Sequence, residues 1–255
     1  MRELLSEEFY KLIHKRGTWY TPIILFMAML AVGFMARHSP DAQWYITAAF
    51  AGTEWAIIIM IVVCATTISM EYEYGTIKHL VIEDKGKVRI FLSKFSIIIL
   101  YDAYLHLLAF GFTLPIKWLM YGGKYSFSAN YEYSQSLMSN LINECLIDFL
   151  GSIVIIGAAL LLSCAAKSAA VAIASGITVI FIGQGVSMML LRNVGRSIPL
   201  LRWNPFNMLN MPNEWSNPAY YENTLLTIKQ LMIGNIGYSI LFILAAFLMF
   251  ERKRI

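Results

Sequence analysis

Long runs of apolar residues alternate with short polar stretches along the chain, and this pattern predicts six membrane-spanning helices. Each run is roughly 18 to 25 residues long or slightly longer, the length of helix that crosses the hydrocarbon core of a bilayer. The predicted spans are Trp19–Ala36, Tyr45–Ser69, Phe91–Leu119, Leu141–Ala166, Ala169–Leu191 and Leu231–Phe250. The predicted fold class is an all-α polytopic membrane protein with a single transmembrane domain over residues 1–255.

The composition agrees with a membrane protein and excludes several other classes. Of the 255 residues, 58% are hydrophobic and 14% are charged, whereas soluble domains average about half apolar and about a quarter charged residues. The net charge is +4 and the basic residues lie in short loops, so nucleic acid is not an expected partner. The cysteines Cys64, Cys145 and Cys164 lack paired spacing, so neither a disulfide framework nor a metal site is expected.

The basic residues of the loops predict how the chain is oriented in the cell membrane. Most of the 20 Lys and Arg residues fall on one side if both termini are cytoplasmic, and cytoplasmic loops carry an excess of such residues. The first residues mix acids with bases and lack a cleavage site, so we expect the first span to remain in the protein. We therefore predict a multi-pass protein with cytoplasmic N- and C-termini.

Two segments outside the spans have a character of their own. Arg2–Arg16 is predicted to be an amphipathic helix lying in the membrane interface. Its apolar half is assigned Leu4, Leu5, Phe9, Leu12 and Ile13. Its polar half is assigned Glu3, Glu7, Glu8, Lys11 and Lys15. Residues 192–228 are rich in proline and asparagine, so short, broken, re-entrant helices are expected at the outer surface before the last span.

The stretch "MEYEYGTIKHL", Met70–Leu80, places charges and a glycine where the chain leaves the second span. On a helix, Glu71, Gly75 and Lys78 would share a polar ridge pointing away from lipid. Glycine weakens a helix by about 1 kcal/mol relative to alanine, so its position on this ridge indicates close approach by another surface. The residues alone leave two interpretations open, a docking helix and a solvated loop that holds the topology.

The longer stretch "SMEYEYGTIKHLVIEDKGKVRIFLSK" resembles the coupling region of ABC-type-2 exporter permeases. In that family an acidic residue, a Gly-Thr pair, a leucine and downstream basic residues form a coupling helix between spans two and three. The matching positions here are Glu71, Glu73, Gly75, Thr76, Lys78, Leu80, Arg89 and Lys94. The N-terminal "EEFYKLIHKRGTWYTP" is similar to the connecting helix of the same family, with Glu8, Lys11, Lys15 and Arg16 as its charged residues. The six-span order also fits.

This resemblance implies a transporter subunit that is not itself an enzyme. Two copies of a cytoplasmic ABC ATPase would receive the coupling segment in a surface cleft and would carry the ATP and Mg. The chain has no G-x-x-x-x-G-K-[ST] motif of its own, and no cofactor is expected in it. Six spans make half of a twelve-span pore, so a homodimer or a sister permease is implied. The resemblance implies a dimer contact that involves the first and fifth spans. In the fifth span Gly176, Gly183 and Gly185 allow a neighbouring helix to approach closely.

Ionisable residues inside the spans are candidates for a substrate path, because charge at membrane depth is costly and is usually functional. Asp102 lies near the middle of the third span, His106 follows one turn later, and Thr113 continues the same stripe. Glu144 and Asp148 are four residues apart in the fourth span, and Glu54 lies in the second. Asp102 and His106 either line a path or form a buried pair that locks helices together, and the sequence leaves both open.

The substrate is not encoded in a recognisable motif. A small stand-alone permease of this size most resembles those that export antimicrobial peptides such as lantibiotics, hydrophobic peptides or drugs, and a sodium exporter is the alternative. Two other classes are weaker alternatives: an intramembrane enzyme using Asp102 and His106 as an acid–base pair, and a passive channel or scaffold.

Overall fold

The computed structural model describes residues 2–75 and 86–253, and within these ranges it consists of helices without a strand. Six of these helices are long and apolar enough to cross a membrane, which confirms the predicted all-α fold. They are α2 Arg16–Ala36, α4 Gly52–Glu73, α6 Lys87–Tyr121, α7 Leu137–Ala165, α8 Ala169–Val194 and α11 Ile228–Arg252. A further helix, α1 Arg2–His14, precedes them as expected.

The chain divides into two compact units, each built from separate stretches of the sequence. Unit 1 comprises residues 1–9, 60–99 and 151–255, and unit 2 comprises residues 10–59 and 100–150. Helices α1, α4, α6 and α7 contribute residues to both units. That the whole chain forms one transmembrane domain stays a prediction.

The second predicted span, Tyr45–Ser69, is not one continuous helix, and its break lies in the part that belongs to unit 2. It is divided into α3 Ala42–Thr47, a short turn η1 Ala49–Ala51, and α4, which begins at Gly52. Ala49, Phe50 and Ala51 have φ angles of 48°, 49° and 60°, and the left-handed conformation costs roughly 1–2 kcal/mol per residue. The predicted start of the span at Tyr45 lies before this turn, whereas α4 begins at Gly52. The sequence did not mark the turn, because all these residues are apolar and carry no proline signal.

Tertiary packing holds this turn in place. The side chain of Phe50 is fully buried in an apolar cluster shared with residues of α2, α6 and α7, among them Met29 and Ile116. At Gly52 an added Cβ would lie 2.8 Å from the sulfur of Met29 and 2.9 Å from Cβ of Ala109. The start of α4 therefore packs directly against both α2 and α6.

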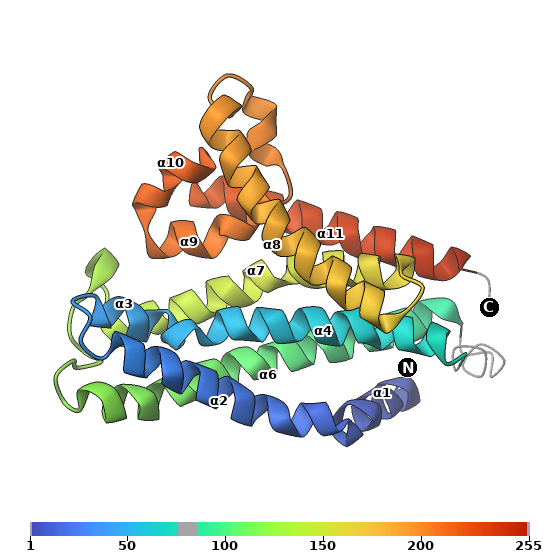
Figure 1. Ribbon diagram of the computed structural model, residues 1–255, viewed down its shortest axis with the longest axis horizontal. Helices are drawn as coiled ribbons and strands as arrows, with labels where there is room; N and C mark the ends of the chain where they lie inside the picture. The colour runs from blue at the N-terminus through green and yellow to red at the C-terminus, as the bar shows by residue number, and fades with distance from the viewer. Residues whose placement is uncertain (1, 76–85, 254–255) are drawn as a thin grey trace. The chain divides into compact units, whose positions relative to one another are not determined.

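In unit 1 the segment between α8 and α11 forms several short helices, as its proline content predicts (Figure 1). They are η3 Pro199–Trp203, η4 Asn207–Asn210, α9 Met211–Ser216, η5 Pro218–Tyr220 and α10 Tyr221–Thr224. Buried asparagines hold them together, since Nδ2 of Asn207 donates to the carbonyls of Arg202 at 2.7 Å and Thr224 at 2.9 Å. Nε2 of Gln184 on α8 donates to Oδ1 of Asn210 at 2.9 Å. The sequence did not reveal this amide network.

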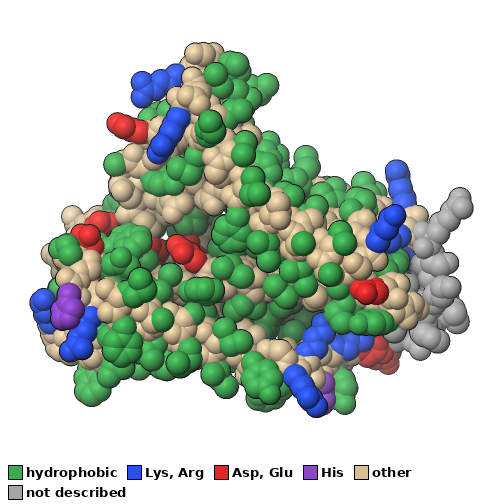
Figure 2. Space-filling view, in the orientation of Figure 1, with side chains coloured by type: hydrophobic (Ala, Val, Ile, Leu, Met, Phe, Trp, Pro, Cys, Tyr) green, Lys and Arg blue, Asp and Glu red, His purple; other side chains and the backbone are tan. Residues whose placement is uncertain are grey.

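Much of the apolar surface of the long helices is uncovered. Hydrophobic side chains cover the helix flanks in Figure 2, whereas Lys and Arg side chains gather near helix ends. In α8 only 17% of the apolar membrane-spanning stretch is buried inside the protein, whereas in α7 the buried share of that stretch is 61%. Exposed flanks of this kind fit contact with lipid tails.

Candidate coupling site

Helix α4 ends at Glu73, and the chain turns immediately after it. The N–H of Tyr74 donates to the Met70 carbonyl at 2.9 Å, and the N–H of Gly75 donates to the Tyr72 carbonyl at 3.3 Å. Gly75 has a φ of +69° and nothing lies within 4 Å of where a Cβ would be. Glycine fits here because the backbone is left-handed at a helix end, and the close approach of another protein's surface to this position stays a prediction. One helix does not run through Met70–Leu80, because α4 stops before Gly75.

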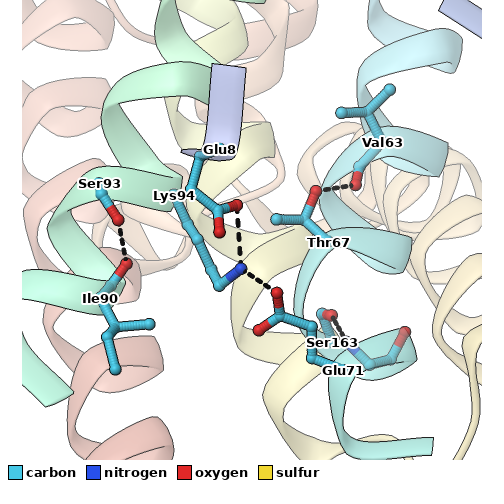
Figure 3. Close-up of polar contacts among 9 residues, drawn as sticks. Glu8, Val63, Thr67, Glu71, Ile90, Ser93, Lys94 and Ser163 are labelled. Carbon is cyan, nitrogen blue, oxygen red and sulfur yellow. Dashed lines mark hydrogen bonds and ion pairs between the residues drawn. The ribbon is translucent and has the colours of Figure 1, made fainter. Parts of the chain in front are cut away.

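The carboxylate of Glu71 points at an ammonium group inside unit 1 (Figure 3). Nζ of Lys94, on α6, lies 2.5 Å from Oε1 of Glu71 and 3.0 Å from Oε2 of Glu8, on α1. The Lys94 side chain is only 2% exposed. This arrangement joins the middle of α1, the end of α4 and the first turns of α6 through one buried cation.

Two expectations are corrected by this contact. Glu71 was expected on an outward-facing ridge and Glu8 on the solvent-facing half of α1, yet both carboxylates point inward. Glu8 follows the buried Leu4 by one turn, so the two residues share a face of α1. The remaining predicted charges of this region, Lys11, Lys15 and Arg16, are exposed.

Tyr72, the next residue, contacts the C-terminal end of α11. Its hydroxyl donates to the Phe250 carbonyl at 3.4 Å, and the two rings pack edge to face at 6.2 Å. Nζ of Lys253 lies 4.0 Å from the centre of the Tyr72 ring, a cation–π contact. The same ammonium donates to the Cys164 carbonyl at the end of α7, at 2.9 Å. Desolvation by burial lowers the pKa of Lys253 from its usual value.

Glu73 reaches a third partner, the start of α8. Its Oε2 accepts a hydrogen bond from the N–H of Ala169 at 2.9 Å. The first N–H groups of a helix lack partners within the helix, and a carboxylate there also interacts favourably with the helix dipole. Glu73 therefore caps α8 from the end of α4.

The start of α6, where the chain resumes after the segment that follows α4, is also held by side-chain contacts. Lys87 is the first residue of α6, and its Nζ donates to the carbonyls of Glu251 at 2.6 Å and Lys253 at 3.3 Å. These carbonyls lie at the end of α11, where they have no partner within the helix. Of the other predicted coupling residues, Thr76, Lys78 and Leu80 lie outside the described residues.

Residues 4–185 match the family model described as ABC-2 family transporter protein. The chain belongs to this family. The match begins in α1 and ends within α8, so it includes Glu8, Glu71, Glu73 and Lys94. The search of curated proteins returned no match. Members of the ABC-2 family are membrane components of ABC transporters and generally work with a cytoplasmic ATPase, so the chain is an ABC permease.

Inside the spans of this ABC-2 permease, the structure brings together ionisable residues from three helices of unit 2. Nδ1 of His106 lies 2.9 Å from the Asp102 carbonyl oxygen and 3.3 Å from Oδ1 of Asp102. Asp148, on α7, interacts electrostatically with His106 and Glu54 and shares a side-chain hydrogen bond with Thr53. The sequence indicated the first pair, but not that Asp148 joins it.

The other two candidates for the path are placed differently. The hydroxyl of Thr113 donates to the Ala109 carbonyl of its own helix at 2.8 Å. Glu144 is buried in α7, one turn before Asp148. That any of these residues lines a substrate path stays a prediction.

The glycines expected at a dimer contact of this permease have different surroundings. A Cβ at Gly183 would lie 2.2 Å from the ring of Phe206, and one at Gly176 would lie 2.9 Å from Ile61. These two glycines therefore accommodate side chains of their own chain. Gly185 has nothing within 4 Å of its Cβ position, and its contact with a second permease stays a prediction.

Proposed function

We propose that this ABC-2 permease is the membrane part of an ATP-driven exporter that moves a hydrophobic or amphipathic substrate out of the cell or out of the membrane. The favoured substrate class is an antimicrobial peptide such as a lantibiotic, or a drug of similar character. Two copies of a separate ATPase would bind and hydrolyse ATP, and a second permease, identical or related, would complete the pore. The termini would lie in the cytoplasm together with the ATPase.

The observation that carries this proposal is the set of contacts at the end of α4. Glu71, Tyr72 and Glu73 are consecutive, and they contact Lys94 of α6, the end of α11 and the start of α8. Lys87 attaches the start of α6 to the end of α11. The connection between α4 and α6 is thus flanked on both sides by side chains that contact other helices.

These contacts supply a physical route for force. An ATPase that moves residues 74–86 would pull on α1, α6, α8 and α11 through the flanking contacts. A buried ion pair suits such a task, because separating it leaves uncompensated charges and costs about 3–5 kcal/mol. The helix ends would therefore move with the connection rather than come apart from it.

Site-specific photo-crosslinking in the native membrane tests the docking of the ATPase. A photoreactive residue at Ile77 should crosslink to a protein that carries the G-x-x-x-x-G-K-[ST] motif, identified by mass spectrometry. The same probe at Asn213, between α8 and α11, is the matched control and should give no such product. Crosslinking of the ATPase at Asn213 and not at Ile77 would reject both the docking site and the orientation.

A further inference from the structure

The chain turns back at the end of α8, and residues 192–203, here called the arginine turn, form this part of unit 1 (Figure 1). The arginine turn carries Arg192, Arg196 and Arg202 and has no acidic residue. None of the three arginines forms an ion pair with an acid among the residues that the structure describes. Their positive charge is therefore not neutralised within the described part of the chain.

The arginine turn also holds apolar side chains away from the protein. Leu200 is 80% exposed and Ile198 is 48% exposed, and Trp203 at the end of the turn is partly exposed as well. Burying such side chains away from water is favourable. Exposed aliphatic and tryptophan side chains beside arginine are typical of segments that lie at a membrane–water interface.

Hydrogen bonds hold the arginine turn in one conformation. Nε of Arg202 donates to the Gly195 carbonyl at 2.8 Å, and its Nη2 donates to the Arg196 carbonyl at 3.3 Å, so this side chain links the two limbs of the turn. The hydroxyl of Tyr238 on α11 donates to the Trp203 carbonyl at 2.7 Å. A surface that is ordered before it binds loses little conformational entropy on binding.

Two guanidinium groups remain available to a ligand. Arg192 donates from Nε and Nη2 to Oδ1 of Asn223 at 3.3 Å and 3.1 Å, which leaves its other N–H groups for a further acceptor. The side chain of Arg196 is exposed. Guanidinium groups bind phosphate oxygens through paired N–H···O bonds, and the positive charge strengthens these bonds.

The length of α8 places these groups at the level of lipid phosphates. The helix begins at Ala169, directly after the exposed Lys167, a charge that favours a position at the membrane surface. Arg192 lies about 35 Å along the helix from Ala169, at a rise of about 1.5 Å per residue. A tilt of about 20° reduces this distance to about 32 Å across the membrane. The hydrocarbon core is about 30 Å thick and the headgroups lie just beyond it.

We propose that the arginine turn binds an anionic phospholipid of the leaflet that it faces. Arg192 and Arg196 hold the phosphate of the headgroup, and Ile198 and Leu200 enter the upper part of the acyl chains. The charge of the turn complements an anionic lipid. It does not complement the same turn of a second copy, which would bring three more arginines and no acid. The proposal does not depend on what the permease exports.

The test uses the full-length permease with the fluorophore bimane attached to Ser197→Cys, an exposed position in the arginine turn. The native cysteines are buried, so the label goes to residue 197. The labelled protein is reconstituted in phosphatidylcholine bilayers that contain a small fraction of lipid brominated in the upper acyl chains, because bromine quenches a neighbouring fluorophore. Basic residues near an anionic surface contribute about fivefold each to binding. Brominated phosphatidylglycerol should therefore reach half-maximal quenching at a mole fraction about tenfold lower than brominated phosphatidylcholine.

Three variants of the labelled protein locate the site. Arg192→Gln combined with Arg196→Gln should bring the two lipids to within about twofold of each other, while quenching by phosphatidylcholine persists. Leu200→Ser should weaken quenching by both lipids and leave their ratio unchanged. Arg37→Gln, which removes an exposed arginine of unit 2, is the matched control and should change nothing.

Several results would overturn the proposal. Equal quenching by the two lipids means that the turn contacts lipid without binding its headgroup. No quenching by either lipid means that the turn lies in water or is covered by another protein, a second copy included. A preference that survives the double arginine variant, or that Arg37→Gln removes equally, is not a property of this turn. If the variants fail to fold, native mass spectrometry of the unmodified permease decides, since equal retention of the two lipids from mixed micelles also overturns the proposal.

Discussion

Replacing Lys94 with methionine is the most informative change at the coupling site. It removes the ammonium that lies 2.5 Å from Glu71 and 3.0 Å from Glu8 and leaves two carboxylates that are 13% and 7% exposed. Removing one partner of a buried ion pair costs about 3–5 kcal/mol, and the partial exposure of Glu71 favours the lower end of that range. At roughly 2–4 °C per kcal/mol for a chain of this size, Lys94→Met should lower Tm by about 6–12 °C.

Thermal unfolding of the detergent-solubilised permease, followed by tryptophan fluorescence, measures this shift. The matched control is Lys229→Met, because Lys229 is an exposed lysine and such changes stay within about 0.5 kcal/mol. The triple variant Glu8→Gln, Glu71→Gln, Lys94→Met removes all three charges and should recover most of the loss, since neutral replacement of a whole buried ion pair is often tolerated. The reasoning is refuted if Lys94→Met matches the wild type, or if the triple variant is no more stable than the single one.

Three further predictions concern other parts of the chain. Gly75→Ala forces a side chain into a φ of +69° and should lower the free energy of unfolding by about 1–2 kcal/mol. The control Gly185→Ala, at an open helical position, should be neutral or stabilising by up to about 1 kcal/mol. Equal effects of the two variants on Tm would contradict the role assigned to Gly75. Burial raises the pKa of the Glu214 carboxyl above its ordinary value of 4.5. The stability that this carboxyl contributes is therefore present below the ordinary pKa and is lost as the pH rises through the raised pKa. Glu214→Gln should therefore flatten the fall of Tm with rising pH, and an unchanged profile would count against it. A cysteine placed at Lys85 should be labelled by impermeant reagents only from the cytoplasm and one at Asn213 only from outside, and the opposite pattern would reverse the orientation.

The long helices could be predicted from the sequence because hydropathy over a membrane-spanning length is a strong signal. The break before Gly52 could not, because alanine and phenylalanine at residues 48–51 are as apolar as the rest of the run. The turn is held by the packing of Phe50 among residues that are far apart in sequence. Short helices in the segment after α8 were indicated by its prolines, but the amide network of Asn207 and Asn210 depends on contacts that only the folded chain shows.

The candidate site was partly predictable for the same reason. Glu71, Glu73 and Lys94 were selected from their resemblance to a coupling region, but the partner of Lys94 on α1 is 86 residues away in sequence. Two features of the sequence could have indicated this ion pair. Lys94 lies among apolar neighbours in "FLSKFSIII" and needs a partner when it is buried. Glu8 follows the apolar Leu4 by one helical turn and so shares its face of the helix. The contacts of Tyr72 and Lys87 with backbone carbonyls leave no trace in the sequence.

ATP-dependent transport in reconstituted vesicles tests the central claim most directly. Vesicles that contain the permease and its ATPase, with the ATPase facing outward, should accumulate a labelled amphipathic peptide only when ATP is added. Lys94→Met should reduce this accumulation much more than Lys229→Met, while ATPase still binds to the permease. Peptide movement that is independent of ATP, or ATP-driven movement of sodium without peptide, would contradict the account.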